Sequence, residues 1–168
     1  MAKSSVVRIA CTVVLAGGIA LLWAHSARPQ DTMNMDHSSA QPGTRVPAYH
    51  KTPPSGALPE TLPPAEFAND PVTHNAYALA EKIKATLYQM PCYCNCDREA
   101  GHTSLLDCYR GTHGAICAIC KKELFYSYQE HKKGKTAAQI RAGIVRGDWS
   151  KIDLTQWTGE TAPSGGGK

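Results

Sequence analysis

The sequence lacks the patterns that mark most common enzyme classes and nucleic-acid-binding proteins. Its 168 residues contain no GxSxG nucleophile elbow, no HExxH motif and no glycine-rich phosphate loop. The charge excess is also small, because 18 Lys and Arg face 14 Asp and Glu for a net charge of +4. Between Ala65 and Trp157 the excess falls to +2, which is too little for a surface that follows a phosphate backbone. We therefore expect neither a nucleic-acid partner nor an enzyme.

Alternating strand patterns and internal repeats are also missing, whereas helical spacings are frequent. An N-cap and proline pair, two capping boxes and several glycine stops predict four helices. These helices start near Pro71, Ser104, Gly114 and Thr136 and end near Met90, Gly111, His131 (with Gly134 as C-cap) and Gly147. Apolar side chains after the last helix are expected to close the core, namely Trp149, Ile152, Leu154 and Trp157. The predicted fold class is a small all-α domain, stapled by disulfides or by metal.

The N-terminus has the layout of a secretory signal, which we place at residues 1–27. Lys3 and Arg8 precede an apolar run from Ile9 to Trp23, and small residues follow it. The run is short of the roughly 20 apolar residues of a spanning helix, so an uncleaved membrane anchor is the alternative. Cys11 lies at the start of this run and not after it, which argues against a lipid anchor. We expect a periplasmic or extracellular protein that leaves the membrane when the signal is cleaved.

Composition divides the rest of the chain into a tether, a folded domain and a tail. Residues 28–64 hold eight of the 11 prolines and few large apolar side chains, so a disordered tether is predicted there. The glycine-rich end, residues 158–168, is predicted to be a disordered tail. Residues 65–157 remain as the cysteine-rich helical domain.

Cysteine is the residue type that dominates the predicted domain. Six of the seven cysteines lie between positions 92 and 120. Cys92, Cys94 and Cys96 follow Pro91, and in an extended segment residues spaced by two point to the same side. Cys117 and Cys120 form a CxxC at the start of a helix, where partial positive charge favours thiolate. The candidate metal ligands are Cys92, Cys94, Cys96, Cys108, Cys117, Cys120, His102 and His113.

Two other interpretations of these cysteines stay open. An exported domain with an even number of cysteines is often a disulfide-stapled structural or interaction module without metal. A thiol-disulfide oxidoreductase using Cys117 and Cys120 is the second alternative, although no strand and helix alternation surrounds the pair. The density of soft donors in CxCxC favours metal, and so do the flanking histidines. A further capture site for copper is expected in the tether, from the thioether and imidazole donors of Met33, Met35 and His37.

The cysteine spacing resembles that of a known bacterial family. Pro91-Cys92-Tyr93-Cys94-Asn95-Cys96, Asp107-Cys108, and His113-Gly114 with Cys117 and Cys120 are similar to the PCYCGC-motif proteins. Asn95 stands where the motif that names the family has glycine. The resemblance covers roughly Ala65 to Trp149 and implies an exported protein, commonly lipid-anchored, whose biochemical role is not established. Separately, Met33 to Ser38 is similar to the Met/His segments of periplasmic copper-resistance proteins.

Together these observations predict an exported, helical, metal-binding protein that sequesters or delivers a soft metal ion through its thiolates. Copper, as Cu(I), is the first expected metal and zinc the second. Another exported protein is a further candidate partner.

Overall fold

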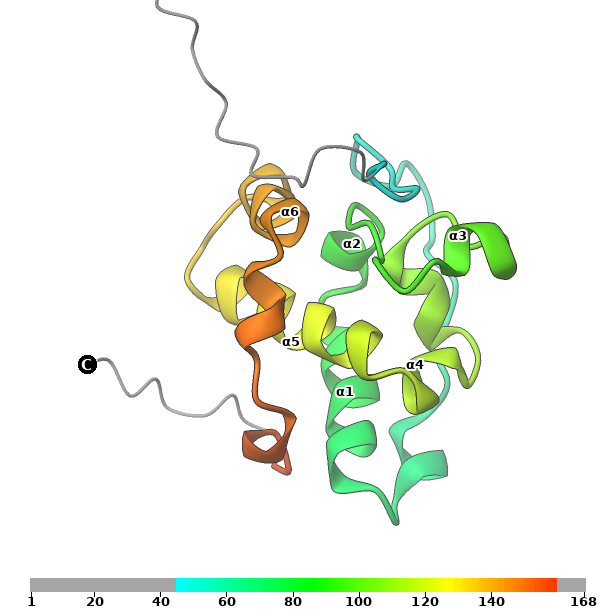
Figure 1. Cartoon of the computed structure of the whole chain (residues 1–168). Helices are drawn as coiled ribbons and strands as arrows, with labels where there is room; N and C mark the ends of the chain where they lie inside the picture. Colours follow the sequence, from blue (N-terminus) through cyan, green and yellow to red (C-terminus); the bar gives the residue numbers. More distant parts are fainter. Residues whose placement is uncertain (1–44, 160–168) are drawn as a thin grey trace, which may run out of the picture. The chain divides into compact units, whose positions relative to one another are not determined.

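The computed structural model describes residues 45–159, and in this range the chain is all-α, as predicted (Figure 1). The α-helices are α1 (Pro71–Lys82), α2 (Lys84–Leu87), α3 (Cys96–Glu99), α4 (His113–Ile116), α5 (Ala118–Lys132) and α6 (Ala137–Arg146). Four 3₁₀ turns join them, η1 (Pro64–Phe67), η2 (Leu105–Tyr109), η3 (Asp148–Lys151) and η4 (Leu154–Gln156). No helix of the described range is long and apolar enough to cross a membrane.

The first predicted helix starts where expected but is broken in the middle. Asp70 caps α1 by accepting a hydrogen bond from the Thr73 N–H at 3.1 Å, and Pro71 is the first helical residue. The helix does not continue to Met90, because Ile83 leaves helical geometry with φ −126° and ψ 28°. The bend allows Leu79 of α1 and Leu87 of α2 to be buried in the same core.

The predicted helix from Gly114 to His131 is also two helices. Cys117 has an extended backbone, with φ −103° and ψ 113°, and separates α4 from α5. Gly114 lies so close to Tyr109 that an added Cβ would be 2.9 Å from its ring, which fixes α4 against η2. Lys121 donates to the Ala115 carbonyl at 2.8 Å and so satisfies an acceptor that the break leaves free. At the other end, Gly134 has the positive φ of 76° that suits a helix stop.

The two capping boxes predicted from the sequence had different outcomes. Thr136 and Gln139 form a complete box at the start of α6, and Gly147 ends that helix with φ 81°. The box predicted at Ser104 was wrong, because the Ser104 side chain is buried and makes no cap. The carboxylate of Asp107 accepts instead from the N–H and the hydroxyl of Thr103, both at 2.8 Å, and a 3₁₀ turn replaces the expected helix.

The core is built around α5, which contacts α1, α2, α4 and α6 (Figure 1). Its Phe125 stacks on Trp157, with the ring centroids 4.2 Å apart. Trp157 is only 1% exposed, and its carbonyl accepts a hydrogen bond from Asn75 Nδ2 of α1 at 3.0 Å. The C-terminal apolar residues therefore close the core, as the sequence predicted.

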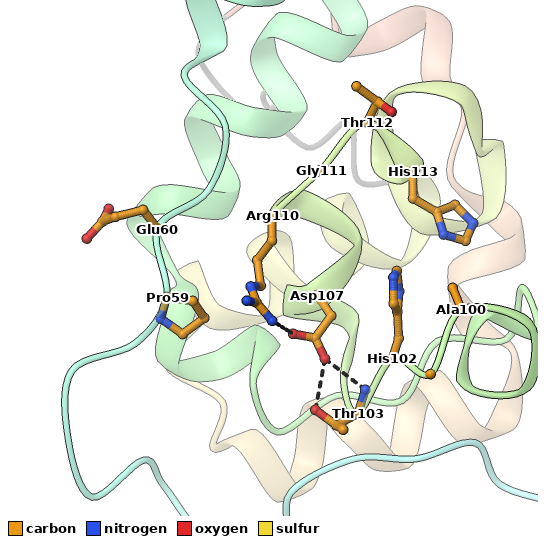
Figure 2. A pocket seen from close by; sticks show the side chains of 11 residues that line it. Pro59, Glu60, Ala100, His102, Thr103, Asp107, Arg110, Gly111, Thr112 and His113 are labelled. Carbon is orange, nitrogen blue, oxygen red and sulfur yellow. Dashed lines mark hydrogen bonds and ion pairs between the residues drawn. The ribbon is translucent and has the colours of Figure 1, made fainter.

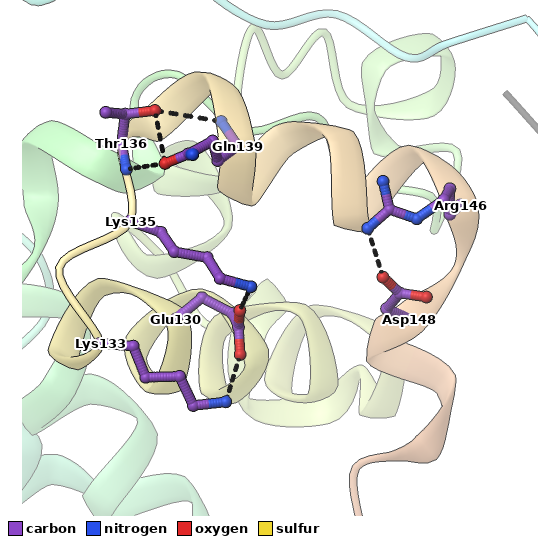
Figure 3. Close-up of polar contacts among 7 residues, drawn as sticks. All are labelled: Glu130, Lys133, Lys135, Thr136, Gln139, Arg146 and Asp148. Atoms are coloured by element: carbon purple, nitrogen blue, oxygen red, sulfur yellow. Dashed lines mark hydrogen bonds and ion pairs between the residues drawn. The ribbon is translucent and has the colours of Figure 1, made fainter. Parts of the chain in front are cut away.

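Ion pairs stabilise the chain at the ends of two helices, one between the end of α5 and the loop that follows it and one between α6 and η3 (Figure 3). The carboxylate of Glu130 is paired with Lys133 at 2.6 Å and with Lys135. Burial raises the pKa of Glu130, but the two ammonium groups outweigh it, so the net pKa is lowered. Arg146 and Asp148 form a second pair at 2.7 Å.

Residues 45–63, which composition assigned to the tether, lie against the helices. Arg45 pairs with Asp97 of α3 at 2.8 Å, and His50 stacks on Tyr88 with the centroids 3.8 Å apart. The Leu62 N–H donates to the Tyr109 carbonyl at 2.9 Å. The packed region thus includes Arg45 to Pro63 as well as the predicted domain. Signal residues 1–27, the tether up to residue 44 and tail residues 160–168 lie outside the described residues.

Candidate metal centre

The CxCxC segment forms a turn, not the extended strip predicted from its spacing. Tyr93 and Cys94 turn the chain, Asn95 adopts a left-handed conformation with φ 67°, and Cys96 begins α3. The Sγ atoms of Cys92 and Cys94 are nevertheless 3.2 Å apart, so the turn brings these thiols to one side by another route. Asparagine tolerates the left-handed region better than most residues, and glycine tolerates it best. This accounts for Asn95 at the position where the motif has glycine.

A buried carboxyl group holds this turn in place. Glu123 of α5 is 0% exposed, and its Oε1 accepts from the Tyr93 N–H at 2.8 Å. Its Oε2 has no hydrogen-bond partner within residues 45–159. Burial raises the pKa of Glu123 well above its usual range. Sequence reasoning missed Glu123, although its place one helical turn after Cys120, on the buried side of α5, was a usable signal.

The chain after α3 carries His102 back toward the cysteines. The Cys96 carbonyl accepts from the Ala100 N–H at 3.0 Å and from the His102 N–H at 3.1 Å. Gly101 makes this reversal with φ 67°. As a result, His102 Nδ1 lies 3.3 Å from Cys108 Sγ, which is in turn 3.6 Å from Cys96 Sγ.

The break between α4 and α5 supplies the remaining ligands. Cys120 is 0% exposed, and its Sγ lies 3.5 Å from that of Cys92 and 3.6 Å from that of Cys94. His113 Nε2 on α4 is 3.8 Å from Cys94 Sγ. Cys117 interrupts the helix predicted from Gly114 to His131, so His113, Cys117 and Cys120 do not lie on one continuous helix. The interruption still directs all three toward Cys94.

All eight candidate ligands of the predicted domain meet in three overlapping sets. Within each set the donor atoms lie within 4.8 Å of one another. The sets are Cys92, Cys94, Cys96 and Cys108; Cys94, His113, Cys117 and Cys120; and His102, Cys108 and His113. The thiol cluster, as we name these six cysteines, could therefore hold a metal ion. Met33, Met35 and His37 lie outside the described residues.

The cysteines of residues 45–159 are free thiols, with no disulfide among them, in contrast to the disulfide alternative. Two sulfurs bound to one tetrahedral zinc at about 2.3 Å are about 3.8 Å apart. Four pairs of sulfurs in the cluster are 3.2 to 3.6 Å apart, close to that value, and no two donor atoms of a set are more than 4.8 Å apart. The cluster therefore needs only small movements to ligate an ion.

The thiols of the cluster differ in their tendency to ionise. The neighbouring Cys120 thiol lowers the pKa of Cys108 to about 4 and that of Cys117 to about 6. The pKa of Cys94 is lowered as well, first by Cys108. Contact with the same Cys108 raises the pKa of Cys92, Cys96 and Cys120. The cysteines with a lowered pKa, which favours the thiolate that binds metal, thus lie next to cysteines with a raised pKa; Cys92 and Cys120, for example, donate to Cys94.

Comparison with known proteins finds one family, which is described by its cysteine motif. A family described as "Protein of unknown function with PCYCGC motif" matches residues 19–148, which include the whole thiol cluster and both histidines. No curated protein matches the chain, and no solved structure matches it.

Proposed function

Since the chain belongs to the PCYCGC-motif family of unknown function, we propose from its own geometry that it is an exported protein that sequesters or delivers Cu(I). The observation that carries this proposal is the gathering of six free thiols, four of them buried and two half-buried, in one cluster. Soft thiolates at this density favour Cu(I) over hard cations.

The sharing of donors favours Cu(I) over Zn(II). Cys94 belongs to both four-membered sets. Cys108 belongs to one of them and also to the set of His102, Cys108 and His113, which we name the histidine set. A thiolate common to two sets can bridge two ions, and Cu(I) readily forms such bridged clusters. The two four-membered sets, four cysteines and three cysteines with one histidine, also match structural zinc sites. Zinc is therefore the second metal of the proposal.

The ligands come from segments that depend on one another for their position. Cys92 and Cys94 lie on a turn, Cys96 on α3, Cys108 on η2 and Cys120 on α5. Since no single element carries a complete ligand set, binding of metal adds to the free energy of unfolding of the domain. The N-terminal layout supports export. Met33, Met35 and His37 support capture of copper at low concentration.

Anaerobic titration of the reduced protein with Cu(I), and separately with Zn(II), tests the proposal. We expect absorption from Cu(I)-thiolate charge transfer and a rise in the melting temperature. Cys94→Ser should lower both metal stoichiometry and melting temperature more than Cys117→Ser, because Cys94 serves two ligand sets and Cys117 one. If Cu(I) produces no thiolate absorption and neither Cu(I) nor Zn(II) raises the melting temperature, the result would favour a protein module without metal.

One observation favours an alternative, thiol-disulfide exchange. Cys117 is half-buried at the start of α5 and has a pKa of about 6, as reactive thiols often do. Its CxxC partner Cys120, however, is packed against Cys92 and Cys94. We expect reduction of a test disulfide no faster than by a free thiol. Replacing Cys117 and Cys120 together should chiefly reduce stability. Rapid reduction by the wild type, abolished in the double variant, would establish the oxidoreductase instead.

A further inference from the structure

A pocket of about 780 Å³ lies next to the thiol cluster, because two of its lining residues, His102 and His113, contact Cys108 and Cys94. Figure 2 shows the residues that line it. His102 and His113 form part of its wall, and their ring centroids are 5.1 Å apart with an angle of 54° between the planes. Both side chains are half-buried. The pocket therefore gives solvent access to two of the candidate ligands.

The histidine set links the pocket to the two four-membered sets, because its histidines line the pocket and two of its members are shared with those sets. Cys108, at 0% exposure, belongs to the set of Cys92, Cys94 and Cys96. His113 belongs to the set of Cys94, Cys117 and Cys120. His102 belongs to neither, yet its Nδ1 is 3.3 Å from Cys108 Sγ. An ion held by the histidine set would already touch one ligand of each of the two four-membered sets.

Side-chain contacts hold this wall of the pocket in place. Asp107 accepts two hydrogen bonds from Thr103, the neighbour of His102, and pairs with Arg110 at 3.2 Å (Figure 2). The charged groups of the lining are the carboxylates of Asp107 and Glu60 and the guanidinium of Arg110. Because the carboxylates outnumber the guanidinium, the lining does not repel a cation.

We infer that His102, Cys108 and His113 form the loading site, through which a soft metal ion passes from this pocket into the thiol cluster. The inference rests on the proposed function. The transfer is an exchange of ligands without change of oxidation state. One metal bond to His102 Nδ1 breaks as a bond to a cluster sulfur forms, and a proton held by that sulfur leaves to solvent. His102 is then free to receive the next ion.

The rate of loading, separated from the amount of metal bound, tests this inference. The reduced full chain is mixed with Cu(I) as its acetonitrile complex, and the growth of thiolate absorption is followed by stopped flow. His102→Ala should load about tenfold more slowly, as expected for about 1.4 kcal/mol of lost transition-state stabilisation, with unchanged stoichiometry. His74→Ala is the matched control, because His74 is half-buried on α1 and belongs to no donor set. Its rate should equal that of the wild type.

A second pair of variants tests the route without altering a ligand. Thr112 is exposed, lines the pocket and makes no side-chain cap, so Thr112→Trp should obstruct the pocket and slow loading. Ala118 is exposed next to the half-buried Cys117 and does not line the pocket. Ala118→Trp should therefore leave the rate of loading unchanged. The inference is overturned if Ala118→Trp alone slows loading, or if His102→Ala loses an equivalent of metal at an unchanged rate. Failure of the wild type to bind any metal would refute the proposed function itself.

Discussion

Asn95 offers the sharpest test of how the thiol cluster is built. It is the one residue other than glycine with positive φ in the described range, at 67°. The left-handed region costs an ordinary L-residue about 1–2 kcal/mol, less for asparagine, and nothing for glycine. We therefore expect Asn95→Ala to lower the free energy of unfolding by about 1 kcal/mol. Asn95→Gly should be close to neutral, because relief of the backbone strain offsets the greater freedom of the unfolded chain.

The effect is large enough to measure by thermal denaturation of the reduced protein. For a domain of this size, about 1 kcal/mol corresponds to a fall of about 3–6 °C in melting temperature. Because the turn positions Cys92, Cys94 and Cys96, the alanine variant should also bind metal about fivefold more weakly. Asn69, which is exposed and has no positive φ, provides the matched control pair of Ala and Gly variants. An alanine variant as stable as the wild type, with a less stable glycine variant, would refute the reasoning.

Three further predictions follow from contacts outside the turn. Gly143→Ala should cost about 1–3 kcal/mol, since its Cβ would overlap the Tyr126 hydroxyl and lie 2.7 Å from Tyr126 Cζ, and Tyr126→Phe should restore part of the loss in urea denaturation. Asp70→Ala should cost about 1 kcal/mol at pH 7. Hydrogen bonds from Thr73 lower the pKa of Asp70 in the folded protein. The stabilisation by this cap is therefore present above the pKa of Asp70 in the unfolded chain and is lost as the pH falls through its pKa in the folded protein. Asp70→Asn, which caps the helix without titrating, should show no such loss. Glu123→Ala should melt at a lower temperature than Glu123→Gln, because only Gln keeps an acceptor for the Tyr93 N–H; equal melting temperatures would show that this hydrogen bond does not hold the turn.

Local signals in the sequence were reliable where local chemistry decides the structure. The cap at Asp70 and the box at Thr136 depend on residues within one helical turn, and both form as predicted. The breaks at Ile83 and Cys117 depend on packing against distant segments, for which periodicity carries no signal. The contacts of residues 45–63 were missed for a similar reason, since Arg45 pairs with a residue 52 positions away.

For the candidate site, the identity of the ligands was easier to predict than their geometry. The spacing of the cysteines was enough to select the residues that meet in the cluster. The left-handed Asn95 was not inferred, because the same spacing also fits an extended segment. Glu123 was missed because a carboxyl group is normally exposed, and only the fold shows that α5 buries it.

The shortness of α2, α3 and α4 has a consequence for how the domain opens. Each spans four residues, far fewer than an isolated helix needs to persist in water, whereas α1, α5 and α6 span 12, 15 and 10. The amides of the short helices are therefore expected to exchange with deuterium through local opening, whereas those of the long helices exchange only when a larger part of the domain unfolds. Metal bound to Cys92, Cys94 and Cys96 would suppress this local opening first. The short helices α3 and α4, which carry Cys96 and His113, are thus expected to exchange readily in the metal-free protein and to gain the most protection from metal.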